Sequence, residues 1–162
     1  MEGRLVALGA TEVIGRLEYD ENRPLGKPRY AGVVDTVGGG TLAAAIASSM
    51  YGGAIATTGL AASGNLPTTV YPFILRGLRL LGIDSTLPWN VLGMGYPEDV
   101  ASWEKYREER IAVWAALATD VTPAALSLIT TKTVPLEALL DTTLSDDILA
   151  GKVLGRVVVD CT

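Results

Sequence analysis

The stretch from Ala31 to Leu60, AGVVDTVGGGTLAAAIASSMYGGAIATTGL, decides the fold. It opens with a short run rich in β-branched residues, which is typical of a strand buried on both faces. A run of glycines follows, and then an alanine-rich segment with high helix propensity. Gly52 and Gly53 are expected to end this helix, and AIATTGL predicts a second buried strand. Together these elements predict a βαβ unit, and hence a parallel sheet with a right-handed crossover.

The same alternation continues toward the C-terminus. TTVYPFILRG predicts a helix with Pro72 in its first turn, and RLLGIDS predicts a third strand. Residues 86–97 are rich in glycine and proline and predict a loop, whereas residues 98–119 predict a long helix with one apolar side. The rest predicts a short helix (VTPAALSLI), a strand (TTKTV), a helix (PLEALLDTTLSDDILAG) capped by Gly151, and a closing strand (VLGRVVVD).

The N-terminal segment fits this pattern less well. MEGRLVALG predicts about two turns of helix, and ATEVIG after it predicts a parallel strand. A parallel strand needs a crossover of about a dozen residues and a partner strand before it. We therefore expect the chain to start in the middle of a βαβ unit.

Composition excludes several classes of protein. The chain has 162 residues, the length of one domain, and its 49% hydrophobic and 19% charged residues argue against intrinsic disorder. Its net charge of −5 has the wrong sign for a protein that binds nucleic-acid phosphates. It contains no histidine, which excludes Ser-His-Asp and Cys-His mechanisms. With a single cysteine, the usual zinc ligand sets are excluded as well, and we expect no metal site.

The same cysteine and the N-terminus bear on the compartment. Cys161 is the only cysteine, so no internal disulfide can form, and we interpret it as part of a frayed terminus. The first residues contain no apolar region long enough for a signal peptide, and no segment is typical of a membrane span. We expect a soluble cytoplasmic protein.

The three glycines permit two interpretations. Gly38–Ala43 fits the G-x-G-x-x-A dinucleotide fingerprint between a strand and a helix. That fingerprint expects an acidic residue about 20 residues later, at the end of the next strand, but no Asp or Glu lies between Asp35 and Asp84. We favour a tight turn late in a doubly wound sheet, and a pyrophosphate-binding loop remains the alternative.

Small residues end three successive strands. The strand ends are Thr36–Gly38, Thr58–Gly59 and Asp84–Ser85, and between Thr36 and Ile83 the only charged residues are Arg76 and Arg79. Ligands of open α/β sheets bind outside the carboxyl ends of the strands, where small residues let a flat ligand approach the backbone. The strand ends are therefore candidate ligand contacts, and a purely structural role is the open alternative.

Other catalytic patterns are absent. No tyrosine is followed by a lysine four residues later, so the short-chain dehydrogenase pair is missing, and there is no P-loop motif. The paired carboxylates stand in polar helical segments and are best explained as solvated surface; they are Glu98/Asp99, Glu108/Glu109 and Asp146/Asp147.

Five segments together resemble a known family. In chain order these are LGATEVIGR, YAGVVDTVGG, YGGAIATTGLA, NLPTTVYPFILRGLRLLGIDS and GKVLGRVVV. They resemble the second half of the zinc-independent medium-chain dehydrogenase/reductases, in the branch of NADPH-dependent acrylyl-CoA reductases, often labelled quinone oxidoreductases. The resemblance covers nearly all of the chain except about residues 87–105, which look like an insertion that shapes the acceptor pocket or is merely a surface loop.

The resemblance implies an α/β fold with an incomplete Rossmann-type parallel sheet. In this family a GroES-like catalytic domain precedes the Rossmann domain, and the last helix and strand return toward the catalytic domain. Residues 1–118 would then be part of the NADPH-binding Rossmann domain and 119–162 the returning segment. The fingerprint turn would lie upstream of Met1, and no catalytic residue would lie in this chain.

The resemblance also implies contacts to NADPH. Arg16 matches the family's basic contact to the adenosine phosphate, and Arg156 is a weaker candidate for a phosphate contact. Leu60 and Ile74 match cofactor-lining positions, and Ser85 matches the position beside the nicotinamide end. At Gly151 only a backbone contact could exist. The expected cofactor-binding residues are, in all, Arg16, Thr58, Gly59, Leu60, Ile74, Asp84, Ser85, Gly151 and Arg156.

The implied chemistry is hydride transfer from NADPH to an α,β-unsaturated thioester or a quinone-like acceptor. By itself the chain is expected to be catalytically incomplete and to form a homodimer through the edge of its sheet. Two alternatives stay open at this point: a non-catalytic dimerising module derived from such an enzyme, and a small independent nucleotide-binding domain that uses the three glycines.

Overall fold

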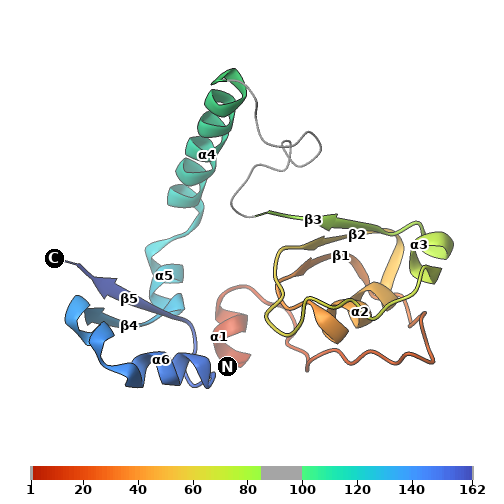
Figure 1. Ribbon diagram of the computed structural model, residues 1–162, viewed down its shortest axis with the longest axis horizontal. Helices are drawn as coiled ribbons and strands as arrows, with labels where there is room; N and C mark the ends of the chain where they lie inside the picture. Colours follow the sequence, from red (N-terminus) through yellow and green to blue (C-terminus); the bar gives the residue numbers. More distant parts are fainter. Residues whose placement is uncertain (1, 85–99, 162) are drawn as a thin grey trace. The chain divides into compact units, whose positions relative to one another are not determined.

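The computed structural model describes residues 2–84 and 100–161 (Figure 1). The chain divides into two compact units, Gly15–Trp103 and the combination of Met1–Ile14 with Glu104–Thr162. Both units contain parallel strands, which confirms the predicted α/β fold. The domain boundary predicted at residue 118 stays a prediction.

The first unit, Gly15–Trp103, is built around a three-stranded parallel sheet. Its strands are β1 (Tyr30–Asp35), β2 (Ser49–Thr57) and β3 (Arg79–Gly82), in the order β1-β2-β3. Helix α2 (Gly39–Ala47) connects β1 to β2, and α3 (Tyr71–Arg76) precedes β3 (Figure 1). The predicted strand–helix–strand unit and the third strand are confirmed.

One face of this sheet carries the core of the unit. Val33, Ile55 and Leu80 stand in register on the three strands. They pack with Leu42 and Ile46 of α2, and Leu78 and Phe73 complete the cluster. Ile46 and Ile55 are fully buried, and burying one such side chain contributes about 1.5–3 kcal/mol. This core fixes the three strand ends relative to one another.

The helix α2 ends earlier than predicted. It stops at Ala47, and Ser48 is its C-cap, so Gly52 and Gly53 lie inside β2 and do not cap the helix. Gly52 has a positive φ of 70°, and the β1–β2 register is irregular just where this residue lies. The glycines therefore permit an irregularity in the strand, which from sequence looks the same as a helix end.

The expected strand ATEVIG is wrong. Residues 10–20, which include this segment, form neither helix nor strand. No strand in the described part of the chain pairs with them, and an isolated strand has no hydrogen-bonded partner to hold it.

The second unit contains a two-stranded parallel sheet, β4 (Thr130–Pro135) with β5 (Arg156–Asp160). Its helices are α1 (Glu2–Ala7), α4 (Val100–Asp120), of which the residues from Glu104 on belong here, α5 (Pro123–Ile129), the 3₁₀ helix η1 (Leu136–Leu140) and α6 (Thr142–Leu149). The Arg4 guanidinium ties α1 to the segment before β5 by donating to the carbonyl of Leu154 at 2.7 Å.

Two predictions in this unit need comment. The single helix expected over PLEALLDTTLSDDILAG is wrong, because it breaks at Asp141 into η1 and α6. Asp141 has an extended ψ of 116° and caps α6 with its carboxylate. The long helix α4 is confirmed, although Ile111 and Trp114 on its predicted apolar side are exposed. The predicted loop at 86–97 lies outside the described residues.

Within the described residues no single helix is long and apolar enough to cross a membrane. Residues Trp103–Asp120 and Pro123–Ile129 satisfy the length and composition test only as a pair, and that pair is bent by 90°.

Candidate functional site

The carboxyl ends of β2 and β3 border an open cavity of about 510 Å³. Its lining consists of Thr57, Thr58, Gly59, Leu60, Gly82, Ile83 and Asp84. The cavity is bordered by two glycines, two threonines, two aliphatic side chains and one carboxylate. Such a surface offers backbone groups at close range together with apolar side chains, as a flat polar ligand requires.

The strand ends are joined by short backbone hydrogen bonds. The N–H of Thr58 donates to the carbonyl of Asp35 at 2.9 Å, which ties the end of β2 to that of β1. The N–H of Ile83 donates to the carbonyl of Thr57 at 2.9 Å, which ties β3 to β2. The cavity floor is therefore a continuous extension of the sheet.

Asp35 is the last residue of β1 and is 5% exposed. Its Oδ1 accepts from the N–H groups of Val37 and Gly38, both at 3.1 Å. Its Oδ2 accepts from the Thr57 hydroxyl at 2.9 Å and from the Gly38 N–H at 3.2 Å. One carboxylate thus binds the turn after β1 and the last residue of β2, and a buried carboxylate needs such donors.

The turn at Gly38 and Gly39 packs against another segment of the same chain. Gly38 and Gly39 have φ angles of 72° and 59°. A Cβ at Gly38 would overlap the carbonyl oxygen of Ser63, and one at Gly39 would lie 3.2 Å from the Ser63 Cβ. The N–H of Ala62 donates to the Val37 carbonyl at 2.8 Å, so segment 59–63 packs on the turn. This packing supports the interpretation as a tight turn, because the close approach that the glycines permit is to the protein's own backbone.

Four of the nine expected cofactor contacts come together at the cavity. Thr58, Gly59, Leu60 and Asp84 all line it, and the Leu60 side chain is 69% exposed. Gly59 is confined to glycine by its surroundings, since a Cβ there would overlap the Thr36 carbonyl oxygen.

Of the other five expected contacts, the two described in the same unit, Arg16 and Ile74, do not line this cavity. Arg16 is exposed in a stretch without regular structure. Ile74 is 72% exposed on α3 and is not among the lining residues. Gly151 (φ 67°) follows α6, and Arg156 begins β5, both in the second unit. Ser85 lies outside the described residues.

Sequence reasoning missed Thr57, Gly82 and Ile83 as lining residues and Asp35 as their support. In the sequence, Asp35 marks only the start of the stretch up to Asp84 that contains no other acidic residue. An isolated acidic residue at the end of a buried strand, followed by glycines whose N–H groups need acceptors, was a usable signal.

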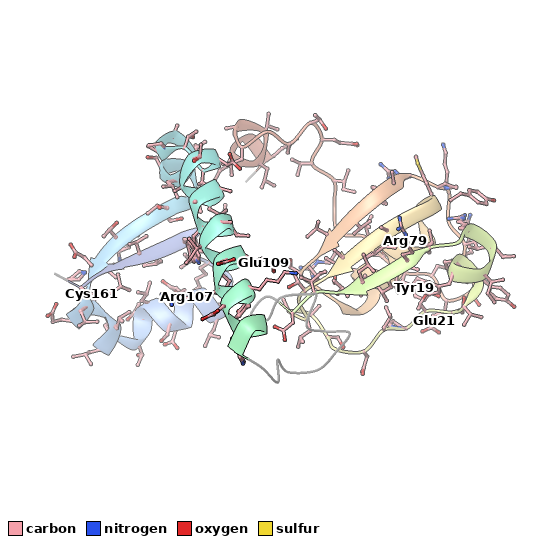
Figure 2. All side chains as sticks on the ribbon, turned by 90° about the horizontal axis from the view of Figure 1, so that it is seen from above. Tyr19, Glu21, Arg79, Arg107, Glu109 and Cys161 are labelled. Carbon is pink, nitrogen blue, oxygen red and sulfur yellow. The ribbon has the colours of Figure 1, made fainter. Side chains whose placement is uncertain are left out.

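Positive charge at the sheet is less available than the sequence suggests. The Arg76 guanidinium is buried and donates to the carbonyls of Ala47, Ser49 and Gly26 at 2.8, 2.9 and 2.6 Å. Arg79, on the edge strand β3, is exposed (Figure 2). Of the two cations between Thr36 and Ile83, only Arg79 is therefore open to an anion.

We assign no function to Cys161 and no metal site to the described residues. The exposed Cys161 Sγ lies 3.9 Å from the carbonyl oxygen of Val159 at the end of the chain (Figure 2). In residues 2–84 and 100–161 no group of three or more Cys, Asp or Glu side chains is arranged to hold a metal ion.

A second, smaller hollow of about 230 Å³ lies between residues 18–27 and the C-terminal half of α2. Its charged lining residues are two acids, Glu18 and Asp20, and two bases, Arg23 and Lys27. Opposite charges in this open setting do not select a ligand of either sign.

No protein-family model matches the chain. The putative quinone oxidoreductase YhfP of Bacillus subtilis is 41% identical over 157 residues, which are 96% of this chain and 42% of that protein. The acrylyl-CoA reductase AcuI of Ruegeria pomeroyi is 40% identical over 158 residues, again 96% of this chain and 42% of that protein. The chain thus spans less than half the length of these relatives.

Solved structures agree with these matches. The YhdH oxidoreductase of Salmonella enterica, solved in complex with NADP, superposes with a TM-score of 0.78 at 35% identity, covering 99% of this chain and 44% of that one. YhdH of Escherichia coli K-12 with bound NADPH gives 0.76 at 33% identity, covering 97% and 42%. YhfP of Bacillus subtilis with bound NAD gives 0.74 at 37% identity, covering 99% and 44%.

Proposed function

The chain is a homologue of the cofactor-binding part of medium-chain oxidoreductases of the acrylyl-CoA reductase and quinone oxidoreductase type, and from that premise we propose that it binds NADPH for hydride transfer. The observation that carries the proposal is the cavity at the strand ends, in a chain whose structural neighbours were solved with NADP or NADPH. Four residues expected from sequence to contact the cofactor line this cavity.

The residues at the cavity fit a dinucleotide. Gly59 and Gly82 bring the backbone to the surface, and a side chain at Gly82 would meet open space. Leu60 and Ile83 offer apolar contact to a flat ring, and Thr58 offers a hydroxyl. No acidic group other than Asp84 stands among the lining residues, so there is little charge repulsion against phosphates.

We assign the remaining contacts in the same proposal. Arg16 would bind the adenosine phosphate, as a guanidinium binds phosphate oxygens in a fork. Ile74 would line the cofactor, and Ser85 would stand beside its nicotinamide end. Gly151 would contribute a backbone group and Arg156 a second phosphate contact.

The cofactor supplies the hydride, and the protein contributes position and exclusion of water. We propose that the acceptor is the β-carbon of an α,β-unsaturated thioester or a quinone-like ring. Within this chain, Leu60 and Ile83 would shield one side of the cavity from water, while Thr58 and the backbone at Gly59 would orient polar groups. None of the 162 residues is assigned a catalytic proton transfer.

A fluorescence titration tests the proposal at Arg16. Wild-type chain should give saturable binding of NADPH, and Arg16→Gln should weaken it by about 10- to 100-fold, since a hydrogen bond to a charged group contributes about 1.5–3 kcal/mol. Binding of NADH should change little, because NADH lacks the phosphate. This comparison matters because the Bacillus neighbour was solved with NAD.

Arg23→Gln is the matched control, since it removes the same charge from an exposed residue at the other hollow. It should leave the affinity for both cofactors unchanged. No saturable signal from the wild-type chain at millimolar NADPH would contradict the proposal. A folded dimer indifferent to NADPH would favour a non-catalytic dimerising module instead.

The homodimer is part of the same proposal, with the exposed edge of β3 as the contact between copies. We also propose the cytoplasm as the location, where NADPH-dependent reductases find their cofactor.

A further inference from the structure

We propose that Asp35 is a positioning residue for the cofactor cavity, acting through Thr57 and the turn at 36–38; this rests on the proposed function. Asp35 is not among the cavity's lining residues, but it accepts a hydrogen bond from the lining residue Thr57. It also accepts from the N–H groups of Val37 and Gly38, in the turn on which Gly59 and Leu60 pack. The inference concerns how one buried carboxylate sets the geometry that a dinucleotide meets.

The first step runs through Thr57. Its side chain donates to Asp35 Oδ2 at 2.9 Å, while its carbonyl accepts from the Ile83 N–H at 2.9 Å. Thr57 is thus held from the side of β1 by its hydroxyl and from the side of β3 by its carbonyl. Both Thr57 and Ile83 line the cavity, so a shift of this residue moves two of the cavity's walls.

The second step runs through the turn. The two N–H groups bound by Asp35 Oδ1 belong to Val37 and Gly38, and the Val37 carbonyl in turn accepts from Ala62. Segment 59–63 rests on this turn so closely that Gly59 has no room for a Cβ beside Thr36. Gly59 and Leu60 therefore take their places from a turn whose shape Asp35 fixes.

The third step is that no other described side chain could replace Asp35 here. Val37 and Gly38 donate to no other side chain among the described residues, and the Thr57 hydroxyl has no second acceptor there. The carboxylate is 5% exposed, so water does not readily substitute for it. Loss of the contact should then loosen the cavity more than the fold, because the hydrophobic core lies at Ile55 and Ile46.

The test compares two hydroxyls on the same strand. Thr57→Val removes the contact to Asp35, whereas Ser49→Ala removes a buried hydroxyl that donates to the Ala45 carbonyl at 2.8 Å, at the far end of β2. We expect Thr57→Val to weaken NADPH binding about tenfold, equivalent to about 1.4 kcal/mol. Ser49→Ala should leave the affinity for NADPH unchanged, while it lowers the unfolding midpoint about as much as Thr57→Val does. Thr57→Ser, which keeps the hydroxyl, should restore binding.

A double-variant cycle separates positioning from direct contact. Asp35→Asn replaces one accepting oxygen by a donor, so it should weaken NADPH binding as well. If both residues act through their mutual contact, the double variant should bind no more weakly than the weaker single variant. Losses that multiply would mean that Thr57 touches the cofactor itself, which overturns the inference, as would equal affinities of Thr57→Val and Ser49→Ala. Failure of the wild-type chain to bind NADPH would instead contradict the proposed function.

Discussion

Two buried charged side chains show how single residues hold the first unit together. Asp35 accepts hydrogen bonds at the carboxyl ends of the strands. Arg76 donates to three carbonyls, those of Gly26, Ala47 and Ser49, where α2 passes into β2. Each charged group is surrounded by backbone groups of opposite polarity, so its burial does not leave an uncompensated charge. The two residues stabilise opposite ends of the sheet.

Arg76→Met should therefore destabilise the chain. It would leave the carbonyls of Ala47 and Ser49 short of their buried donor and remove the stacking of the guanidinium 5.9 Å from the Tyr51 ring centroid. We expect a loss of about 3 kcal/mol in the free energy of unfolding by denaturant, because three buried hydrogen bonds from a charged donor are lost. Arg79→Met removes an exposed arginine and should change it by less than about 0.5 kcal/mol. Equal losses from both variants would show that Arg76 contributes no more than a surface residue.

At the scale of helices and strands, prediction succeeded where hydrophobic pattern and partner lay close together in the chain. The unit from β1 to β2 and the helix α3 with Pro72 in its first turn are examples. It failed at Gly52, where one residue type can end a helix or bend a strand. It also failed at ATEVIG, because a strand depends on a distant partner and the local sequence carries no information about one.

The cap that Asp141 provides for α6 is a local signal whose contribution to stability depends on pH. The Asp141 carboxylate caps α6 by accepting from the Thr143 N–H at 2.9 Å, and the hydrogen bonds to Thr143 hold its pKa below the ordinary value of 3.8. Since the folded pKa is lower than the unfolded one, the stabilisation is complete above pH 3.8 and is lost as the pH falls through the lowered value.

We expect Asp141→Asn to lower the unfolding midpoint relative to wild type near neutral pH. The difference should shrink as the pH falls below 3.8, because the wild-type carboxyl group is then protonated as well. Thermal unfolding followed by helical circular dichroism measures this. Asp146→Asn removes a charge from the same helix outside the cap and serves as the control. A difference that stays constant with pH would contradict the assignment of the cap.

For the whole molecule, the sequence predicted the strand ends as a ligand edge but could not assemble the complete site. Thr58, Gly59, Leu60 and Asp84 are brought together by the register of neighbouring parallel strands, which hydrophobic pattern already implies. Gly151 and Arg156 lie in the second unit, and no periodicity relates one unit to another. Their role therefore rests on resemblance, and it stays a prediction.

The outer strands of the sheet in the first unit lead to a prediction of the oligomeric state. β1 and β3 are its outer strands (Figure 1), and Val34 on β1 is 80% exposed. An edge strand offers a row of unpaired backbone groups to another chain. Because the Ile83 N–H points to β2, the alternation of a strand directs the Gly82 N–H to the open edge. We expect the chain to sediment as a dimer through β3.

Gly82→Pro should shift that dimer toward monomer, since proline has no N–H to donate across the edge. Gly82→Ala is the matched control: a Cβ at this position meets no atom within 4 Å, and the N–H is kept. Sedimentation velocity on the two variants at equal concentration distinguishes them. A wild-type monomer would contradict the dimer outright, and a dimer that persists in Gly82→Pro would exclude strand pairing at β3 as its basis. NADPH titration of each variant then shows whether the cavity, which Gly82 also lines, depends on that pairing.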